Sequence, residues 1–339
     1  MRHTGQHCRA AAGALVAVGA LLGLVAQTVP AGAETGGAGP GGPGSTARED
    51  TARFWTPERM REAEPLDLLG PGGGSGSGTG TGSPERAVPR GPELKVPGER
   101  AERRAAGPLA FPEGGGPWTG GGAVEQTSGR VFFTYQGRTA SCSGNAVTSE
   151  NDSTVITAGH CVKLDGAWHT DWVFVPGYHD GQAPYGKWTA AETLTTPQWE
   201  ASEDINYDVG AAVVAPLDGQ RLTDVVGAQG LAFNTGYNKD MYAFGFPAAA
   251  PYDGEQLIYC SGTTFRDFLL SDDHGLGCDM TGGSSGGPWF TEFDETAGTG
   301  LQSSVNSFGY TFLPGTMFGP YFGADAQNLY ETAQTTQPG

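Results

Sequence analysis

The stretch Thr281-Gly282-Gly283-Ser284-Ser285-Gly286-Gly287-Pro288-Trp289 places Ser285 in a turn with glycines on both sides. Glycines allow strained backbone angles and let a ligand approach main-chain N–H groups closely. If Ser285 attacks a carbonyl carbon, the N–H groups of Gly283 and Ser285 are suited to stabilise the oxyanion that develops. A Gly/Ser-rich surface loop is the alternative, because the chain contains 57 glycines. A histidine and an aspartate upstream favour the first interpretation.

The upstream histidine is His160, in the sequence Val155-Ile156-Thr157-Ala158-Gly159-His160-Cys161. This pattern predicts a buried strand, then a turn of small residues, then the imidazole. Imidazole is the side chain best suited to accept a serine proton near neutral pH. A lone histidine at a strand end is more often structural, and it is the surrounding sequence that favours a general base here.

The upstream aspartate is Asp208, which precedes the apolar segment 209–214. An acid at the start of a buried strand either caps a turn or orients an imidazole and stabilises its cation. The order His160, Asp208, Ser285 separates the possible architectures. The Gly-x-Ser-x-Gly pattern around Ser285 also fits α/β-hydrolases, but that fold needs a histidine after the serine, and the last histidine is His274. The subtilisin order needs an aspartate well before His160, together with an α/β pattern that is absent.

Short β-rich segments follow one another from about residue 118, separated by Asp, Gly, Pro and Asn clusters. Because no long helices alternate with them, the pattern predicts an all-β barrel or sandwich. Residues 117–339 are long enough for two small barrels, at about 117–220 and 225–323. A C-terminal helix is predicted over 324–334.

These motifs resemble the chymotrypsin/trypsin (S1) family of serine peptidases, over about residues 118–339. Thr157-Ala158-Gly159-His160-Cys161 resembles the histidine motif of that family, and Gly283-Ser284-Ser285-Gly286-Gly287-Pro288 its serine motif. Ser307-Phe308-Gly309 is similar to the strand along which a substrate backbone pairs. Residues 176–188 resemble the secreted bacterial branch, which includes glutamyl-endopeptidase-like enzymes.

The resemblance implies two antiparallel six-stranded β-barrels and a serine endopeptidase that acts on protein or peptide substrates. Ser285 is then the nucleophile, His160 the proton shuttle and Asp208 the residue that orients His160, and no cofactor is needed. A non-catalytic two-barrel homologue that acts as a binding protein is the alternative, and an intact triad argues against it.

The sequence departs from the family pattern beside the nucleophile. Animal members have an aspartate immediately before the serine, which pairs with the new N-terminus on activation, whereas this chain has Ser284. Asp279 lies where trypsin-like enzymes bind a basic side chain of the substrate, which makes it a predicted substrate-binding residue. The neighbouring Cys278 indicates a different pocket wall, so a pocket for an acidic or polar side chain is the alternative. Its predicted lining residues are His274, Thr281 and Ser304.

Four cysteines remain outside the N-terminal segment that contains Cys8, and they allow three disulfide pairings. Their order favours Cys142–Cys161 and Cys260–Cys278, each closing a short local loop. The resemblance implies the first pair as the staple of the histidine loop. A metal site at His160 and Cys161 is the alternative. It is disfavoured because no second Cys or His lies at ligand spacing, so we expect no metal.

The first 33 residues resemble a secretory signal peptide, with Arg2 and Arg9, an apolar run over 10–25 and the small residues Ala31-Gly32-Ala33. The apolar run is short for a membrane span. We therefore expect a secreted, extracellular protein with no membrane segment in its mature form.

Residues 34–116 are rich in Gly, Pro, Ser, Ala, Arg and Glu, and we expect them to be largely disordered. An apolar island over 54–69 is the exception, and it predicts a short helix with Pro57 in its first turn. We interpret 34–116 as a propeptide removed at or soon after the basic cluster at 100–104. A linker or stalk is the alternative.

The net charge of −18 falls entirely on residues 117–339, because acidic and basic side chains balance before them. A negative surface repels nucleic acid and anionic lipid, so neither is an expected partner. The expected partners are a protein or peptide substrate and the chain's own propeptide, and we expect a monomer.

Overall fold

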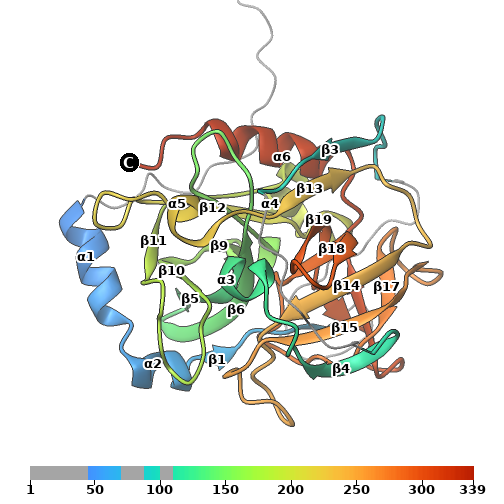
Figure 1. Cartoon of the computed structure of the whole chain (residues 1–339), viewed down its shortest axis with the longest axis horizontal. Coiled ribbons are helices and arrows are strands. Elements are labelled where there is room, and N and C mark those ends of the chain that lie inside the picture. Colours follow the sequence, from blue (N-terminus) through green and yellow to red (C-terminus); the bar gives the residue numbers. More distant parts are fainter. Residues whose placement is uncertain (1–44, 70–87, 100–109) are drawn as a thin grey trace, which may run out of the picture. The chain divides into compact units, whose positions relative to one another are not determined.

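Residues 45–69, 88–99 and 110–339 are described by the computed structural model of the chain (Figure 1). The predicted signal peptide lies outside these residues, as do the glycine-rich stretch 70–78 and the basic cluster at 100–104. None of the described helices is long and apolar enough to cross a membrane.

A closed antiparallel barrel forms the first half of the fold. Its strands are hydrogen-bonded in the order β6-β5-β10-β11-β12-β7, and an additional β6–β7 pairing closes the ring. The strands are β5 (Ser128–Tyr135), β6 (Arg138–Ala146), β7 (Thr154–Thr157), β10 (Thr170–Pro176), β11 (Trp188–Thr195) and β12 (Gly210–Val214). We call this the first barrel.

Local sequence explains the first hairpin of the first barrel and the burial of strand β12. Gln136 and Gly137 join β5 to β6 with φ values of 48° and 79°, the left-handed geometry of a tight hairpin. Strand β12 is buried along its whole length, which its small Gly, Ala and Val residues allow. Asp208, the predicted orienting acid, lies two residues before this strand.

The second half of the fold consists of two sheets. A seven-stranded sheet has the order β3-β13-β19-β18-β14-β15-β4, and a five-stranded sheet has the order β16-β17-β21-β20-β2. Three of these strands, β2 (Leu68–Leu69), β3 (Leu94–Val96) and β4 (Glu113–Pro117), come from the N-terminal segment. The other strands are β13 (Gly230–Phe233), β14 (Asp240–Gly245), β15 (Ile258–Thr263), β16 (Phe265–Arg266), β17 (His274–Gly277), β18 (Pro288–Asp294), β19 (Thr299–Val305), β20 (Phe308–Gly309) and β21 (Thr316–Gly319). The predicted all-β class is confirmed.

Helices are few. The predicted C-terminal helix is confirmed as α6 (Ala324–Thr335), whose Leu329 and Tyr330 join the core of the first barrel. The sequence did not predict the short helices α3 (Ala123–Thr127), α4 (Pro197–Ser202) and α5 (Leu222–Val226), the 3-10 turns η1 (Gly159–Cys161) and η2 (Ile205–Tyr207), or the hairpin of β8 (Lys163–Leu164) and β9 (Ala167–Trp168).

The described parts of residues 34–116 form helices and strands, so the predicted disorder is wrong for them outside the apolar island 54–69, where a short helix was predicted. They form α1 (Ser45–Phe54), α2 (Pro57–Glu62), β1 (Glu64–Pro65), β2 (Leu68–Leu69), β3 (Leu94–Val96) and β4 (Glu113–Pro117). Each of these strands adds to a sheet of the main fold, because its unpaired backbone groups find partners there. Helix α2 confirms the predicted short helix, with Pro57 in its first turn and the Thr56 side chain capping it.

Trp55 is the main anchor of this N-terminal segment. It is completely buried, with Met60, in a cluster that includes Phe132 and Tyr178 of the first barrel. Its indole N–H donates to the Asp171 carbonyl at 2.7 Å. Figure 1 shows α1 and α2 beside β10 and β6, in agreement with their contacts. Burial of one large apolar side chain contributes about 1.5–3 kcal/mol, so composition alone underestimated the order of this segment.

Both predicted disulfides are confirmed. Cys142 is bonded to Cys161 and Cys260 to Cys278, across sequence separations of 19 and 18 residues. The first joins β6 to the turn that carries His160, and the second joins β15 to the segment that leads to Ser285.

Replacing Cys260 and Cys278 by serine is expected to lower the free energy of unfolding by about 3 kcal/mol, because the open chain gains loop entropy when unfolded. Urea denaturation at pH 7 measures this. An unchanged midpoint in the double variant would contradict the assigned role of this bridge.

Candidate active site

Ser285 lies in a tight turn between β17 and β18, and 4% of its surface is exposed. The backbone on either side requires glycine. Gly283 has φ +94°, and Gly286 has φ +81° with space so limited that a Cβ would lie 2.1 Å from the Thr157 hydroxyl. The predicted reason for the flanking glycines therefore agrees with the backbone of the turn.

Two buried polar side chains hold this turn in place. The Ser143 hydroxyl donates to the Gly283 carbonyl at 2.9 Å, and the Ser143 N–H donates to the Ser285 carbonyl at 2.7 Å. On the other side, the Asn306 amide donates to the Ser284 carbonyl at 3.0 Å, and its oxygen accepts from the Trp289 indole at 2.7 Å. Sequence reasoning missed Ser143 and Asn306, since no local motif marks either residue.

Asp208 is completely buried and accepts three hydrogen bonds. His160 donates to it through its backbone N–H at 2.7 Å and is hydrogen-bonded through its ring Nδ1 at 2.7 Å. The Ser307 hydroxyl donates to the same carboxylate at 2.5 Å. The carboxylate thus fixes the imidazole with Nδ1 toward Asp208 and Nε2 free for other contacts.

The turn that carries His160 is supported by His169. The ring Nε2 of His169 lies 2.8 Å from the His160 carbonyl, and the ring stacks on Phe133 at a centroid distance of 4.2 Å. Burial lowers the pKa of His169 to about 4. His169 is therefore neutral at pH 7, and its Nε2–H donates to His160.

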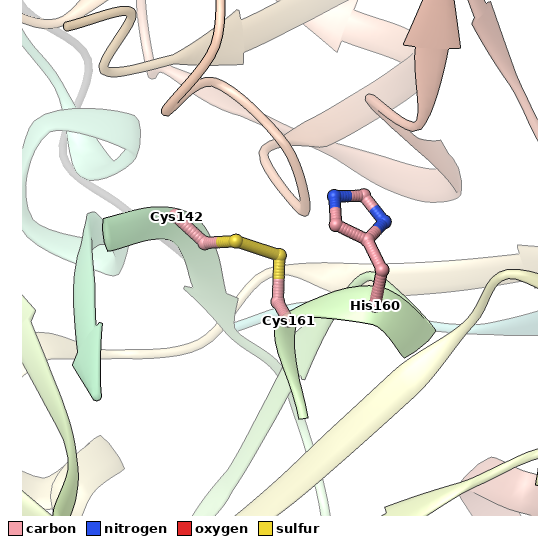
Figure 2. Close-up of side chains that lie close together, drawn as sticks. All are labelled: Cys142, His160 and Cys161. Atoms are coloured by element: carbon pink, nitrogen blue, oxygen red, sulfur yellow. A yellow bond between two sulfur atoms is a disulfide. The ribbon is translucent and has the colours of Figure 1, made fainter. Parts of the chain in front are cut away.

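Figure 2 shows His160 beside the Cys142–Cys161 disulfide, with Cys161 on the same short turn. Potential metal-ligand atoms of these three residues lie within 4.8 Å of one another. The two sulfur atoms are bonded to each other, however, so neither offers the thiolate that a metal needs. The disulfide therefore joins the turn that carries His160 to β6.

Ser285 and His160 are not hydrogen-bonded to each other in this structure. Among the residues that the structure describes, none bonds the buried Nε2 of His160. The Ser285 hydroxyl instead donates to the Leu66 carbonyl at 3.5 Å, and the Gly283 N–H donates to the same oxygen at 2.9 Å. Leu66 belongs to the predicted propeptide and was not a predicted site residue. The apolar island over 54–69 was the one signal in the sequence that this segment packs on the main fold.

The predicted substrate strand lies beside the site. Ser307 contacts Asp208, while Phe308 is buried against Phe318 and pairs with it across β20 and β21. Gly309 completes β20. The parallel strand β2 occupies the free edge of β20.

The predicted pocket residues lie in three different surroundings. Asp279 is exposed and accepts from the Tyr252 hydroxyl at 2.5 Å, in a surface hollow whose described lining contains neither Ser285 nor His160. His274 is completely buried, stacked on Tyr321 at 5.5 Å, and both ring nitrogens lack a hydrogen-bond partner among the described residues. Thr281 and Ser304 donate their hydroxyls to the backbone carbonyls of Ala249 and Pro320.

The chain is similar to two solved proteases over most of their length. The protease Anisep from Arthrobacter nicotinovorans is 46% identical, with a TM-score of 0.59, over 62% of this chain and 96% of Anisep. A thermostable serine protease, AL20, from an extremophilic microorganism is 42% identical, with a TM-score of 0.60, over 63% of this chain and 100% of AL20. A Glu endopeptidase structure at 17% identity and a TM-score of 0.53 shares the fold.

The remaining comparisons match a smaller part of this chain or none of it. An extracellular metalloprotease of Bacillus subtilis (strain 168) is 34% identical over 82 residues, which is 24% of this chain. The chain spans only 25% of the length of that relative. No family model matches the sequence.

Replacing the buried His274 by phenylalanine is expected to reduce the loss of stability in acid. Burial lowers the pKa of His274 from 6.5 to about 3, so only the unfolded chain binds its proton between these values. Stability therefore falls as the pH falls through this window, by up to about 1.4 kcal/mol per pH unit for one group. Urea unfolding of His274→Phe from pH 7 to pH 4.5 measures the change.

The exposed His179 provides the control, as His179→Phe. If both variants lose stability with acid as steeply as the unsubstituted chain, the assigned burial of His274 is wrong.

Proposed function

Because this chain belongs to the chymotrypsin-like family of serine proteases, we propose that it is a secreted serine endopeptidase with Ser285, His160 and Asp208 as its catalytic triad. The observation that carries this proposal is the buried Asp208 carboxylate. It holds the His160 imidazole by one hydrogen bond to the ring Nδ1 and the His160 backbone by a second, from its N–H. The next residue, Cys161, contacts the Ser285 carbonyl through its sulfur at 3.6 Å.

In the first step the Ser285 hydroxyl attacks the carbonyl carbon of a peptide bond, and its proton passes to Nε2 of His160. Asp208 stabilises the resulting imidazolium, which its contact with Nδ1 allows. The oxyanion forms beside the Gly283 and Ser285 N–H groups. That the Gly283 N–H already binds a carbonyl oxygen supports this assignment.

In the second step His160 delivers the proton to the leaving amine, and the acyl group stays on Ser285 as an ester. His160 then takes a proton from water, and the hydroxide formed attacks the ester carbon. Breaking the ester bond releases the acid product, and the proton returns to the Ser285 oxygen. Ser307, Phe308 and Gly309 pair with the substrate backbone as an added strand.

Secretion and maturation are part of the proposal. The signal-like residues 1–33 and two disulfides in one chain support an oxidising, extracellular location. Residues 34–116 are the propeptide, and residues 117–339 are the mature protease domain, which we expect to act as a monomer.

Ser285→Ala is expected to abolish labelling of the processed protein by a fluorophosphonate probe and cleavage of a peptide library. Asp208→Asn is expected to lower kcat by about 10⁴-fold, because the imidazole loses its orienting charge. Ser303→Ala is the control, since the buried Ser303 hydroxyl has no hydrogen-bond partner among the described residues. Undiminished labelling of Ser285→Ala, or no labelling of the processed protein, would favour a binding protein instead.

The same peptide library tests Asp279. We expect no strong preference for arginine or lysine, because the Tyr252 hydroxyl already binds the Asp279 carboxylate. A strong basic preference that Asp279→Ser removes would show instead that Asp279 binds the substrate.

A further inference from the structure

Residues 64–69 cross the candidate active site, and we call them the strap. On one side of the site, β1 pairs in parallel with β6, where Pro65 lies opposite Ser141. On the other side, β2 pairs in parallel with β20, where Leu68 lies opposite Phe308. The strap therefore runs from β6 to β20.

Leu66 lies at the centre of the strap and is held through its backbone. Its N–H donates to the Ser141 carbonyl at 2.9 Å. Its carbonyl oxygen accepts from the Gly283 N–H at 2.9 Å and from the Ser285 hydroxyl at 3.5 Å. The oxygen of Leu66 thus occupies the place proposed for the oxyanion of a substrate.

Asp67, the residue after Leu66, lies against the turn that carries Ser285. A Cβ on Gly282 would lie 3.0 Å from the Cβ of Asp67, so the strap contacts the nucleophile turn closely. The pKa of Asp67 is raised because the surrounding protein displaces water, and the nearby His160 imidazole partly offsets this. With the strap in place the His160 ring is completely buried.

The proposed chemistry fixes the direction in which a substrate must run. His160 gives its proton to the leaving amine, so that amine must lie on the His160 side of Ser285. His160 is stapled to β6 through Cys161 and Cys142. A cleavable peptide therefore runs from β20 toward β6, with its acyl part on β20.

The strap runs the other way. Beyond the Leu66 carbonyl the chain continues through the Asp67 nitrogen toward β20, away from β6. The nitrogen that would have to leave is therefore on the wrong side of the site for His160 to protonate. The Ser285 hydroxyl also donates its hydrogen to the Leu66 oxygen rather than to His160.

We infer that residues 64–69 are a built-in inhibitor that binds the catalytic cleft in the direction opposite to a substrate, and so blocks it without being cleaved there. This inference rests on the proposed function of Ser285 and His160. The cleft would bind, in this reversed direction, an extended peptide that pairs in parallel with β6 and β20.

The rest of the N-terminal segment keeps the strap in the cleft. Trp55 and Met60 are buried against the first barrel only a few residues before the strap. Leu66 and Leu68 themselves pack against the core of that barrel. Because the anchor and the strap are linked by so few residues, the strap has a high effective concentration at the site.

Disulfide cross-linking tests the direction, and it does not depend on activity. In the full chain carrying Ser285→Ala, the pair Leu69→Cys with Gly309→Cys and the pair Glu64→Cys with Ala140→Cys are expected to cross-link after mild oxidation, because these residues are register partners. The exchanged pairs, Leu69→Cys with Ala140→Cys and Glu64→Cys with Gly309→Cys, are the matched controls. Their yield is expected to be lower by about tenfold or more, since their Cα atoms lie beyond disulfide reach. Cross-linking of the exchanged pairs, or of none, would overturn the inference.

Fluorophosphonate labelling of the full chain tests the inhibition. Leu66→Ser with Leu68→Ser loosens the strap and is expected to raise the labelling rate by at least about tenfold, since it removes two apolar contacts. Leu94→Ser, at the more exposed Leu94 of β3, is the matched control and is expected to leave the rate unchanged.

The outcomes separate the inference from the proposed function. Equal labelling rates in the full chain, the double variant and the control would overturn the inference alone. Cleavage of the Leu66–Asp67 bond ahead of any other bond, seen by mass spectrometry, would also overturn it. No labelling even of the processed protein would overturn the proposed function.

Discussion

The Asp208 carboxylate is the interaction on which the arrangement of the site depends. The carboxylate is completely buried between the two halves of the fold. It is hydrogen-bonded to the backbone N–H and the ring of His160 and to the hydroxyl of Ser307. Burying a charged carboxylate costs free energy unless hydrogen bonds to its oxygens compensate for the lost water. His160 from the first barrel and Ser307 from the second half therefore have to meet at this point.

The turn that carries Ser285 lies at the same boundary between the two halves of the fold. Ser143 from β6 and Asn306 from the second half hold the backbone around Ser285 from opposite sides. Rigid support of this kind matters because a proton transfer requires donor and acceptor within hydrogen-bond distance.

Sequence predicted the parts of the fold that depend on local pattern. The β-rich runs, the helix that ends the chain, the two disulfides and Pro57 in the first turn of α2 all follow from periodicity, turn residues or spacing. The three residues Ser285, His160 and Asp208 could be singled out because each lies in a distinctive context of glycines, small residues or a buried strand. Their catalytic roles stay a proposal.

What sequence could not predict depends on contacts between distant segments. Composition suggested a largely disordered propeptide. In the structure Trp55 and Met60 pack against apolar side chains of β5 and β10. The strap pairs with the strand edges of β6 and β20. Composition measures only the apolar surface that a segment can bury against itself, not against a neighbour. His274 looked like a pocket residue from its position in the chain, whereas its aromatic neighbours Tyr237 and Tyr321 bury it.

In the proposed mechanism Ser285 attacks a carbonyl carbon of a peptide that enters the cleft from the β20 side. A crystal structure of the processed protein after reaction with a peptidyl phosphonate tests it most directly. We predict a covalent bond between phosphorus and the Ser285 Oγ, a phosphonyl oxygen bound by the Gly283 and Ser285 N–H groups, and a peptide that pairs antiparallel to β20. A phosphonate bonded to another residue, or a peptide that runs parallel to β20 as the strap does, would contradict it.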